Sequence, residues 1–216
     1  MSNISLTFTE GGQMPEAAAE RRQETAVYYG PGGEEMDSKP EGLTHLYHNH
    51  LTEKDNPVIV FRGKLDKLAA LILEAQFLGA EKENRAFVND LQEILEFVRS
   101  LLPAEYEKRP LGEFHLLGLS SRELREKSHH PERYFGRRHL LMEHTMGALS
   151  VRLNLLRTVV RETELAAVTA FRDPENPSKC LREDIVEALN RLSSLFYILI
   201  YKYLPRDYSP SGSAGI

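Results

Sequence analysis

The sequence contains a single cysteine, Cys180, so no disulfide can form within the chain. Because proteins without disulfides are typical of reducing compartments, we expect a cytoplasmic protein. No run of about 18 consecutive apolar residues occurs, so the sequence has no hydrophobic segment that could cross a membrane as a helix. The N-terminus also lacks the basic start and apolar core of a secretory signal.

The chain also lacks an excess of positive charge. Its net charge is -5, which argues against a general nucleic-acid binder, since affinity for phosphate backbones needs clustered cations. We find no Ser-His-Asp or Cys-His pattern typical of a nucleophilic enzyme. What is present, 41% hydrophobic and 27% charged residues in 216, is typical of one globular domain with its own core.

Apolar residues recur with a helical period through most of the chain. They predict helices over about 60–80, from Phe87 to before Pro103, from Leu149 to before Asp173, and from Ile185 to before Pro205. A shorter helix is predicted after Ser120 or Ser121, either of which could cap it. No alternation of period two stands out, so we expect an all-α fold: an antiparallel bundle of four to five long helices in a single domain.

The two ends of the chain differ from this pattern. Glycines, prolines and acidic residues are frequent in residues 1–42, which predicts a flexible N-terminal arm. Residues 206–216 are rich in serine, glycine and proline, which predicts a disordered tail. The helical bundle is therefore expected to occupy residues 43–205.

Polar residues form a stripe along each of the last two predicted helices. Arg157, Arg161 and Glu164 are spaced i, i+4 and i+7, so they share one face. They could form ion pairs on a solvated surface, or the arginines could bind an anion, since guanidinium groups match phosphate oxygens. The spacing alone does not decide between these interpretations.

The stripe on the last predicted helix consists of uncharged polar residues. Asn190, Ser194, Tyr197 and Tyr201 are spaced i, i+4, i+7 and i+11 beside the apolar face. An asparagine flanked by leucines, followed by a serine and tyrosines, suits hydrogen bonds to a purine or a ribose.

Two histidine-containing segments have open interpretations. His45, His48 and His50 could bind zinc or iron, but a structural site usually needs four ligands, and a solvated loop is the simpler interpretation. Between Ser121 and His139 there are six Lys or Arg against three Glu, plus three His. This basic segment could face a phosphate group or be exposed to solvent.

Several motifs resemble those of cobalamin (corrinoid) adenosyltransferases, most closely the ethanolamine-utilisation type. The paired signatures are RTVVRETE at 157–164 and EALNRLSS at 187–194. FRGKLD at 61–66, GLSSREL at 118–124, HPERYFG at 130–136 and LNLLR at 153–157 resemble that branch in order and spacing. The resemblance covers roughly residues 40–204.

The resemblance implies transfer of the 5′-deoxyadenosyl group of ATP to the cobalt of cob(I)alamin, with release of inorganic (tri)phosphate. The cobalt is itself the nucleophile, so no catalytic nucleophile is expected from the protein. ATP with Mg²⁺ and cobalamin are the implied ligands. By the resemblance, the ATP contacts are Arg161, Glu164, Asn190 and Arg191.

The resemblance also implies a homo-oligomer, with a trimer favoured over a dimer. Arg157 and Asp66 match a charge pair that bridges subunits beside the nucleotide, although Asp66 could instead pair locally with Arg62 at i, i+4. A corrinoid-dependent ethanolamine-lyase system is an implied partner, and a bacterial microcompartment is an alternative location within the cytoplasm.

The chain departs from the family in three places. A glycine-rich phosphate loop with a Thr-Lys-x-Gly-Asp signature is absent, and SLTFTEGG at 5–12 resembles it only weakly. The Cys-Cys-x-x-Cys metal motif is absent. The position of the aromatic residue that the better-known branch uses to displace the lower cobalt ligand falls near Leu141, where the sequence is apolar and has no ring; Tyr134 or Phe135 could substitute for it. A non-catalytic module that binds a corrinoid or a nucleotide is therefore the alternative function, and a helical scaffold that binds neither is the third.

Overall fold

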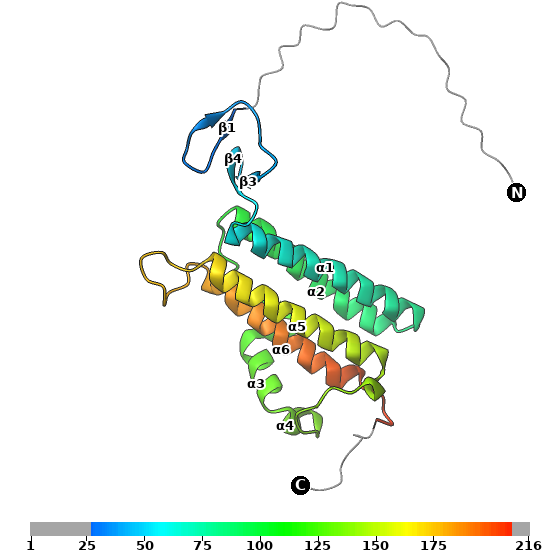
Figure 1. The fold of residues 1–216 in the computed structure, drawn as a ribbon. Coiled ribbons are helices and arrows are strands. Elements are labelled where there is room, and N and C mark those ends of the chain that lie inside the picture. The colour runs from blue at the N-terminus through cyan, green and yellow to red at the C-terminus, as the bar shows by residue number, and fades with distance from the viewer. Residues whose placement is uncertain (1–26, 209–216) are drawn as a thin grey trace, which may run out of the picture.

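Four long helices make up most of the protein in the computed structural model, which describes residues 27–208. They are α1 (Pro57–Glu81), α2 (Arg85–Tyr106), α5 (Gly147–Ala170) and α6 (Glu183–Tyr203). The packed pairs, α1 with α2, α1 with α5 and α5 with α6, are each antiparallel, whereas α2 and α5 run in the same direction (Figure 1). The predicted antiparallel bundle is therefore confirmed.

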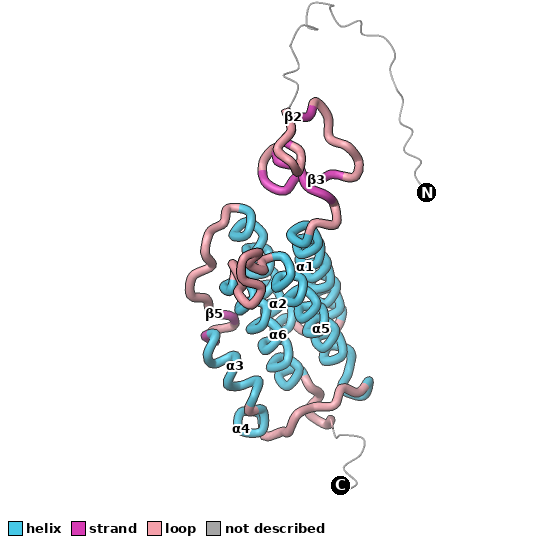
Figure 2. The backbone as a smooth tube through the Cα atoms, turned by 60° about the vertical axis from the view of Figure 1, so that its left-hand side comes forward, coloured by secondary structure: helices cyan, strands magenta, loops and turns pink. Residues whose placement is uncertain are grey.

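The remaining elements are short. They are β1 (Tyr28–Tyr29), β2 (Glu35–Met36), β3 (Leu43–Tyr47), β4 (His50–Glu53), β5 (His115–Leu116), β6 (Leu119–Ser120), α3 (Ser121–His129), α4 (Pro131–Phe135) and the 3₁₀ helix η2 (His144–Met146). Helix α3 packs on α6, and α4 continues from it at the same side of the bundle (Figure 2). The segment from β5 to η2 thus lies against the α5–α6 hairpin.

Local sequence explains where the first two helices begin. The Asn56 side chain accepts a hydrogen bond from the Val58 amide, and Pro57 occupies the first turn, where its missing N–H costs nothing. Asn84 caps α2 in the same way through the Phe87 amide. The expectation that α2 ends before Pro103 is wrong: α2 continues to Tyr106. Pro103 lies in the last turn of α2, and only three helical residues follow it. The backbone hydrogen bond that proline cannot donate is therefore missing only near the end of the helix.

The apolar faces predicted from periodicity meet in one core. It is built from all four long helices together with Leu116 and Leu124, and its largest fully buried side chains include Phe61, Phe87 and Phe196. Helix α5 ends at Ala170, three residues before the predicted stop, because the chain turns at Asp173, whose side chain accepts from the amides of Glu175 and Asn176 in the loop. The core fixes α5 against α6.

The expectation of a purely all-α fold is wrong in one part. Strands β1–β4 form a four-stranded sheet in the order β2-β1-β4-β3, at the end of the bundle where α1 begins (Figures 1 and 2). These strands are two to five residues long and mostly half-buried or exposed, so no clear alternation marks them. Part of the predicted arm therefore contains strands, while its residues 1–26 lie outside the described chain.

A buried ion pair fastens this sheet to the bundle. Arg62 Nε donates to Glu105 Oε2 at 2.8 Å, and Glu105 is 2% exposed. Tyr47 Oη donates to the other carboxylate oxygen at 2.7 Å, and Arg62 Nη1 donates to the Leu46 carbonyl. The local Arg62–Asp66 pair is therefore not formed. Strand β3, α1 and α2 instead meet at one carboxylate.

The predicted capping of the short helix is confirmed. Ser120 caps α3 by accepting from the Glu123 amide, and the Glu123 carboxylate accepts from the Ser120 amide, which completes a capping box. Residues 206–208 of the predicted tail are described and form a turn after α6; the rest lies outside the described residues. No helix in the range 27–208 is both long enough and apolar enough to cross a membrane.

Candidate functional site

The polar stripes of α5 and α6 line a common cleft. Its volume is about 350 Å³, and both helices contribute to its walls. Its lining residues are Arg157, Arg161, Glu164 and Leu165 from α5, Asn190, Ser193, Ser194 and Tyr197 from α6, and Ser128 and His129 from α3. The structure therefore brings three of the four expected ATP contacts together.

A hydrogen-bonded chain orders one side of this cleft. Asn190 Nδ2 donates to Glu164 Oε1 at 2.8 Å, and Arg191 Nη2 donates to Asn190 Oδ1 at 2.7 Å. The amide of Asn190 is thereby oriented across the α5–α6 interface. Arg191 itself is only 9% exposed and does not line this cleft, so it differs from the other three residues in its position.

The two arginines of the α5 stripe have no carboxylate partner among the described residues. Arg157 is half-buried and its Nε donates to Asn154 Oδ1, while Arg161 is exposed. Burial, and then the positive charge of Arg161, lower the pKa of Arg157 below its usual value. The row of surface ion pairs is thus absent from the stripe. Two neighbouring cations without a counter-charge favour binding of an anion.

The expected Arg157–Asp66 pair is not formed within the chain. Asp66 lies exposed on α1, and no ion pair joins it to any residue between 27 and 208. Its neighbours Lys64 and Lys67 instead pair with Glu162 of α5. Asp66 therefore has no ion-pair partner within the described part of its own chain, as a pair with Arg157 of another subunit would require.

Tyr197 connects this cleft to the loop that follows α4. Its hydroxyl lies 2.9 Å from His139 Nδ1 and 2.8 Å from the Tyr201 hydroxyl, and it accepts from the Leu140 amide. Tyr201 in turn donates to the Arg138 carbonyl. The loop is held against α6 by these two hydroxyl groups, and burial together with the Tyr197 contact raises the pKa of Tyr201 well above its usual value.

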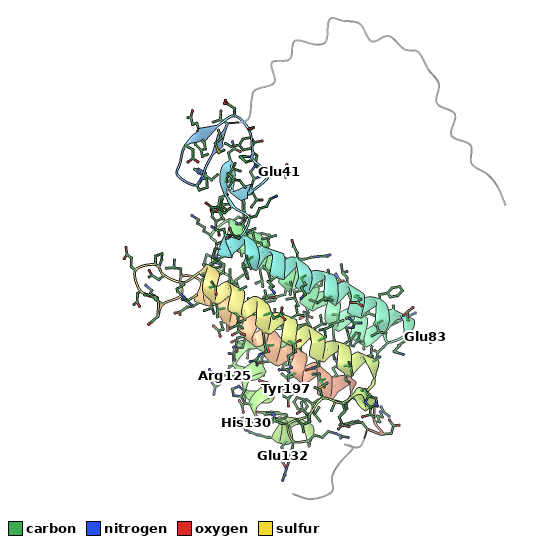
Figure 3. All side chains as sticks on the ribbon, viewed as in Figure 1. Glu41, Glu83, Arg125, His130, Glu132 and Tyr197 are labelled. Carbon is green, nitrogen blue, oxygen red and sulfur yellow. The ribbon has the colours of Figure 1, made fainter. Side chains whose placement is uncertain are left out.

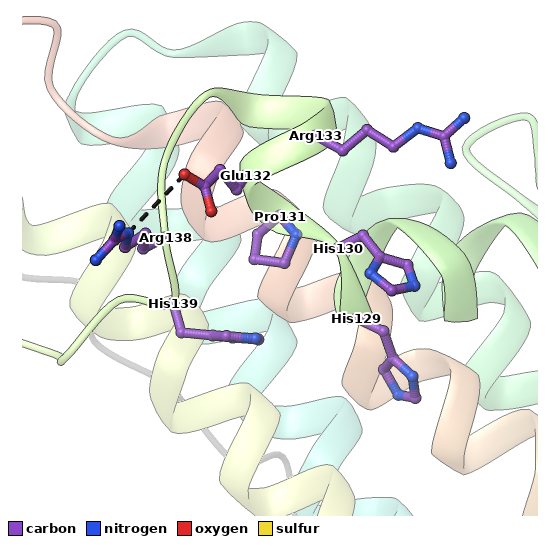
Figure 4. Close-up of a pocket in the computed structure, with 7 residues that line it drawn as sticks. All are labelled: His129, His130, Pro131, Glu132, Arg133, Arg138 and His139. Atoms are coloured by element: carbon purple, nitrogen blue, oxygen red, sulfur yellow. Dashed lines mark ion pairs between the residues drawn. The ribbon is translucent and has the colours of Figure 1, made fainter.

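A larger pocket of about 850 Å³ adjoins this loop. Its walls are His129, His130, Pro131, Glu132, Arg133, Arg138 and His139 (Figure 4). His129 also lines the α5–α6 cleft, so the two hollows are neighbours. Three imidazoles and two guanidinium groups against one carboxylate make this pocket suitable for a polar or anionic ligand. The sequence signal for it was the basic segment before His139, although periodicity could not place it beside the stripes.

The three residues expected to face a corrinoid have different surroundings. Leu141 is 86% exposed, which is unusual for a large apolar side chain. Phe135 stacks on Tyr201, with ring centroids 4.7 Å apart. Tyr134 is exposed, and its hydroxyl donates to Glu126 Oε1 at 2.6 Å. Of the three, Leu141 is the one without a partner inside the described chain.

Within the part of the chain that the structure describes, the three histidines near the sheet are not gathered around one point. His45, His48 and His50 contact three different rings, those of Tyr28, Tyr106 and Tyr29 respectively. Within residues 27–208, no group of three or more His, Cys, Asp or Glu side chains is placed to hold a metal ion. These imidazoles pack the sheet and its contact with α2.

Comparison with known proteins gives the context of this geometry. Residues 36–203 match the family described as cobalamin adenosyltransferase. The chain belongs to the cobalamin adenosyltransferase family. The match includes both helices of the cleft and the whole of the α3–α4 segment.

Two relatives illustrate the similarity. The chain is 38% identical over 162 residues to the corrinoid adenosyltransferase EutT of Escherichia coli (strain K12), and 37% identical over 162 residues to the protein of that name from Salmonella typhimurium. The aligned part is 75% of this chain and 58% of each relative. The chain therefore spans somewhat more than half the length of these cobalamin adenosyltransferase relatives.

Proposed function

We propose that this protein transfers the 5′-deoxyadenosyl group of ATP to the cobalt of cob(I)alamin, forming adenosylcobalamin and inorganic triphosphate. The observation that carries the proposal is the α5–α6 cleft. Arg157 and Arg161 lie there without a carboxylate partner, beside the hydrogen-bonded pair of Glu164 and Asn190. The cleft lies within the segment that matches the family.

The chemistry needs little more than this set of residues. The electron pair of cobalt(I) forms the bond to C5′ of ATP, the bond between C5′ and its oxygen breaks, and the electron pair leaves with the triphosphate. Negative charge on the departing oxygen grows as the bond breaks. Arg161, exposed in the cleft and free of a carboxylate, is placed to stabilise that charge.

Glu164 and Asn190 have a different role in the proposal. The Asn190 amide is fixed by hydrogen bonds on both of its sides, so it can present a constant pattern to the ribose or the base. Glu164 accepts one hydrogen bond through Oε1, which leaves Oε2 for a ligand. Mg²⁺ commonly uses one or two carboxylates together with substrate phosphates, so this donor set fits a magnesium ion that arrives with ATP.

The corrinoid is proposed to bind on the side of the loop that follows α4. Leu141 projects there with its side chain almost wholly exposed, and His139 and Tyr197 lie between the larger pocket and the cleft. Leu141 would cover apolar surface of the corrinoid. Tyr134 and Phe135 contribute less directly, because the first is held by Glu126 and the second by Tyr201.

We also propose a homo-oligomer, with a trimer favoured. Large apolar side chains remain exposed on α1 and α5, among them Leu73, Phe77, Val151 and Leu155, and Phe77 is 66% exposed. A second chain that covers this face could also bring its own Asp66 carboxylate to Arg157. In the cell, we place the protein in the cytoplasm or a bacterial microcompartment, as the source of cofactor for a corrinoid-dependent ethanolamine lyase.

An anaerobic assay tests the proposed reaction. Chemically reduced cobalamin, ATP and Mg²⁺ are mixed with the protein, and loss of the cob(I)alamin absorbance is followed as adenosylcobalamin forms. Arg161→Ala should lower kcat by about 100-fold, because it removes an electrostatic contact to the leaving group. Glu162→Ala, one position along α5 on another face, is the control and should keep its activity.

The outcomes separate the three candidate functions. Binding of ATP without product formation would favour a non-catalytic nucleotide-binding or corrinoid-binding module. Binding of neither ligand would favour a helical scaffold. Arg161 is exposed, so its replacement should change the free energy of unfolding by about 0.5 kcal/mol or less. Unfolding of Arg161→Ala would show that the residue is structural.

A further inference from the structure

Arg191 is buried in an unusual way. It is 9% exposed, and its Nε is fully buried with no hydrogen-bond partner among the described residues. Its one hydrogen bond runs from Nη2 to the Asn190 side chain, and no carboxylate of the described chain forms an ion pair with it. Burial of a guanidinium group is costly unless a counter-charge compensates it.

A second cation faces Arg191 from α3. Arg125 lies exposed on α3, the helix that packs on α6 (Figure 3), and its side chain makes no hydrogen bond or ion pair with the described residues. Burial, and then the charge of Arg125, lower the pKa of Arg191. Glu187 and Glu164 act on that pKa in the opposite direction, but neither forms an ion pair with Arg191 among the described residues, so two arginines are held near one another without an ion-pair partner. Such a pair is unfavourable alone and favourable around an anion.

Both arginines line a pocket of about 540 Å³ at the N-terminal end of α3. Arg122 adds a third positive charge there. The pocket also contains two carboxylates, Glu113 and Glu187, and the second accepts a hydrogen bond from Ser121 Oγ. The start of α3 adds the positive end of its helix dipole. Positive charge therefore exceeds negative charge in this pocket.

The pocket neighbours the proposed nucleotide cleft on α6. Asn190 lines the cleft, Arg191 lines the pocket, and a hydrogen bond joins their side chains. Glu187 and Arg191 are one helical turn apart, which is about 5 Å along the axis. A chain of phosphates that starts beside Arg161 can therefore continue along α6 into the pocket.

We propose that the pocket between α3 and α6 binds the terminal phosphates of ATP, with Arg125 and Arg191 as their ligands. The inference rests on the proposed function for the identity of the nucleotide. In this proposal, α3 and α6 supply the phosphate contacts that a glycine-rich loop makes elsewhere in the family, because the sequence shows no such loop. Arginine suits this role because its planar group binds two phosphate oxygens at once.

Calorimetry with inorganic triphosphate tests the pocket without any need for turnover. The full-length protein should bind inorganic triphosphate, and Arg125→Met should weaken this binding about tenfold while the affinity for adenosine stays the same. Arg99→Met is the matched control, since Arg99 is exposed on α2 and does not line any part of the pocket. Equal triphosphate affinities of the Arg125 and Arg99 variants would overturn the inference. So would a wild-type protein that does not bind triphosphate.

Arg191 needs a separate variant because it is buried. Arg191→Lys keeps the charge but loses the fork of nitrogens, and it should also weaken triphosphate binding. If this variant does not fold, Arg125→Met still decides the matter. In the adenosyl-transfer assay, Arg125→Met should raise the KM for ATP about tenfold. An active wild-type enzyme with an unchanged KM in Arg125→Met would refute only this inference. A wild-type protein that binds triphosphate in an Arg125-dependent manner but transfers no adenosyl group would instead refute the proposed reaction.

Discussion

Glu105→Gln tests whether a single carboxylate holds the sheet to the bundle. Glu105 is 2% exposed and accepts from Tyr47 Oη at 2.7 Å, from Arg62 Nε at 2.8 Å and from Arg62 Nη2 at 3.3 Å. Glutamine has nearly the same shape as glutamate, but it is uncharged. Its amide nitrogen donates a hydrogen bond at a position where a carboxylate oxygen accepts one. Arg62 would be left as a largely buried cation without a counter-charge.

The size of the effect follows from this geometry. Loss of one partner from a buried ion pair costs about 3–5 kcal/mol, and glutamine can still accept one of the three hydrogen bonds, so we expect a loss of about 3 kcal/mol. For a chain of this length, each kcal/mol lowers Tm by about 2–4 °C, which gives a decrease of roughly 6–12 °C. Thermal unfolding followed by circular dichroism at 222 nm measures this decrease.

The control lies two residues further along the chain. Glu107 pairs with Arg109 at 3.3 Å, but both side chains are more than half exposed, so Glu107→Gln should cost about 0.5 kcal/mol or less. Hydrogen exchange adds a local readout, because Glu105→Gln should speed exchange of the β3 and β4 amides more than that of α5. If the two variants have equal Tm values, Glu105 does not fasten the sheet and the reasoning from burial is refuted.

Two further predictions concern the packing of α1 and the stability of the protein at alkaline pH. A Cβ at Gly79 would lie 2.5 Å from Phe87 Cδ1, whereas one at Gly63 would meet no atom within 4 Å. Gly79→Ala should therefore destabilise the protein by about 1–3 kcal/mol and Gly63→Ala should stabilise it by about 0.5–1 kcal/mol in urea titrations; the same sign for both would contradict the packing of α1 on α2. Burial, and then the hydrogen bond to Glu105, raise the pKa of Tyr47 from 10.0 to about 12. Since the folded state keeps this proton longer than the unfolded state, the contribution is complete below pH 10 and is lost as pH rises toward 12. Tyr47→Phe should flatten this part of the stability profile, and an unchanged profile would show that Tyr47 does not cause it.

The sequence predicted the long helices well, and the reason is physical. Each presents one apolar face over about five to seven turns, so periodicity alone identifies which residues enter the core. The sheet has no such signal. Its strands are two to five residues long and are held by ring contacts, such as Tyr29 with His50, and by the link from Arg62 to Glu105. A partner 43 residues away along the chain has no local signature.

The candidate site was predictable to a similar degree. Spacing placed Arg157, Arg161 and Glu164 on one face of α5, and Asn190 on one face of α6. Contact between Glu164 and Asn190 depends on the register between those helices, which the core determines. The packing of α3 on α6 could not be predicted, because the segment between α2 and α5 lacks a long period. Its basic residues were visible in the sequence, but their position beside α6 was not.

Arg62 and Arg191 are both largely buried, and the difference between them supports a functional role for Arg191. Arg62 has a carboxylate at 2.8 Å, which is what a guanidinium group needs when its purpose is to hold the fold. Arg191 is buried to a similar extent, forms no ion pair among the described residues, and lies near a second arginine. Burial of such an arginine is costly, and a bound anion would offset that cost. In our proposal, the phosphate chain of ATP is that anion, at the position where the hydrogen bonds from Glu164 through Asn190 end.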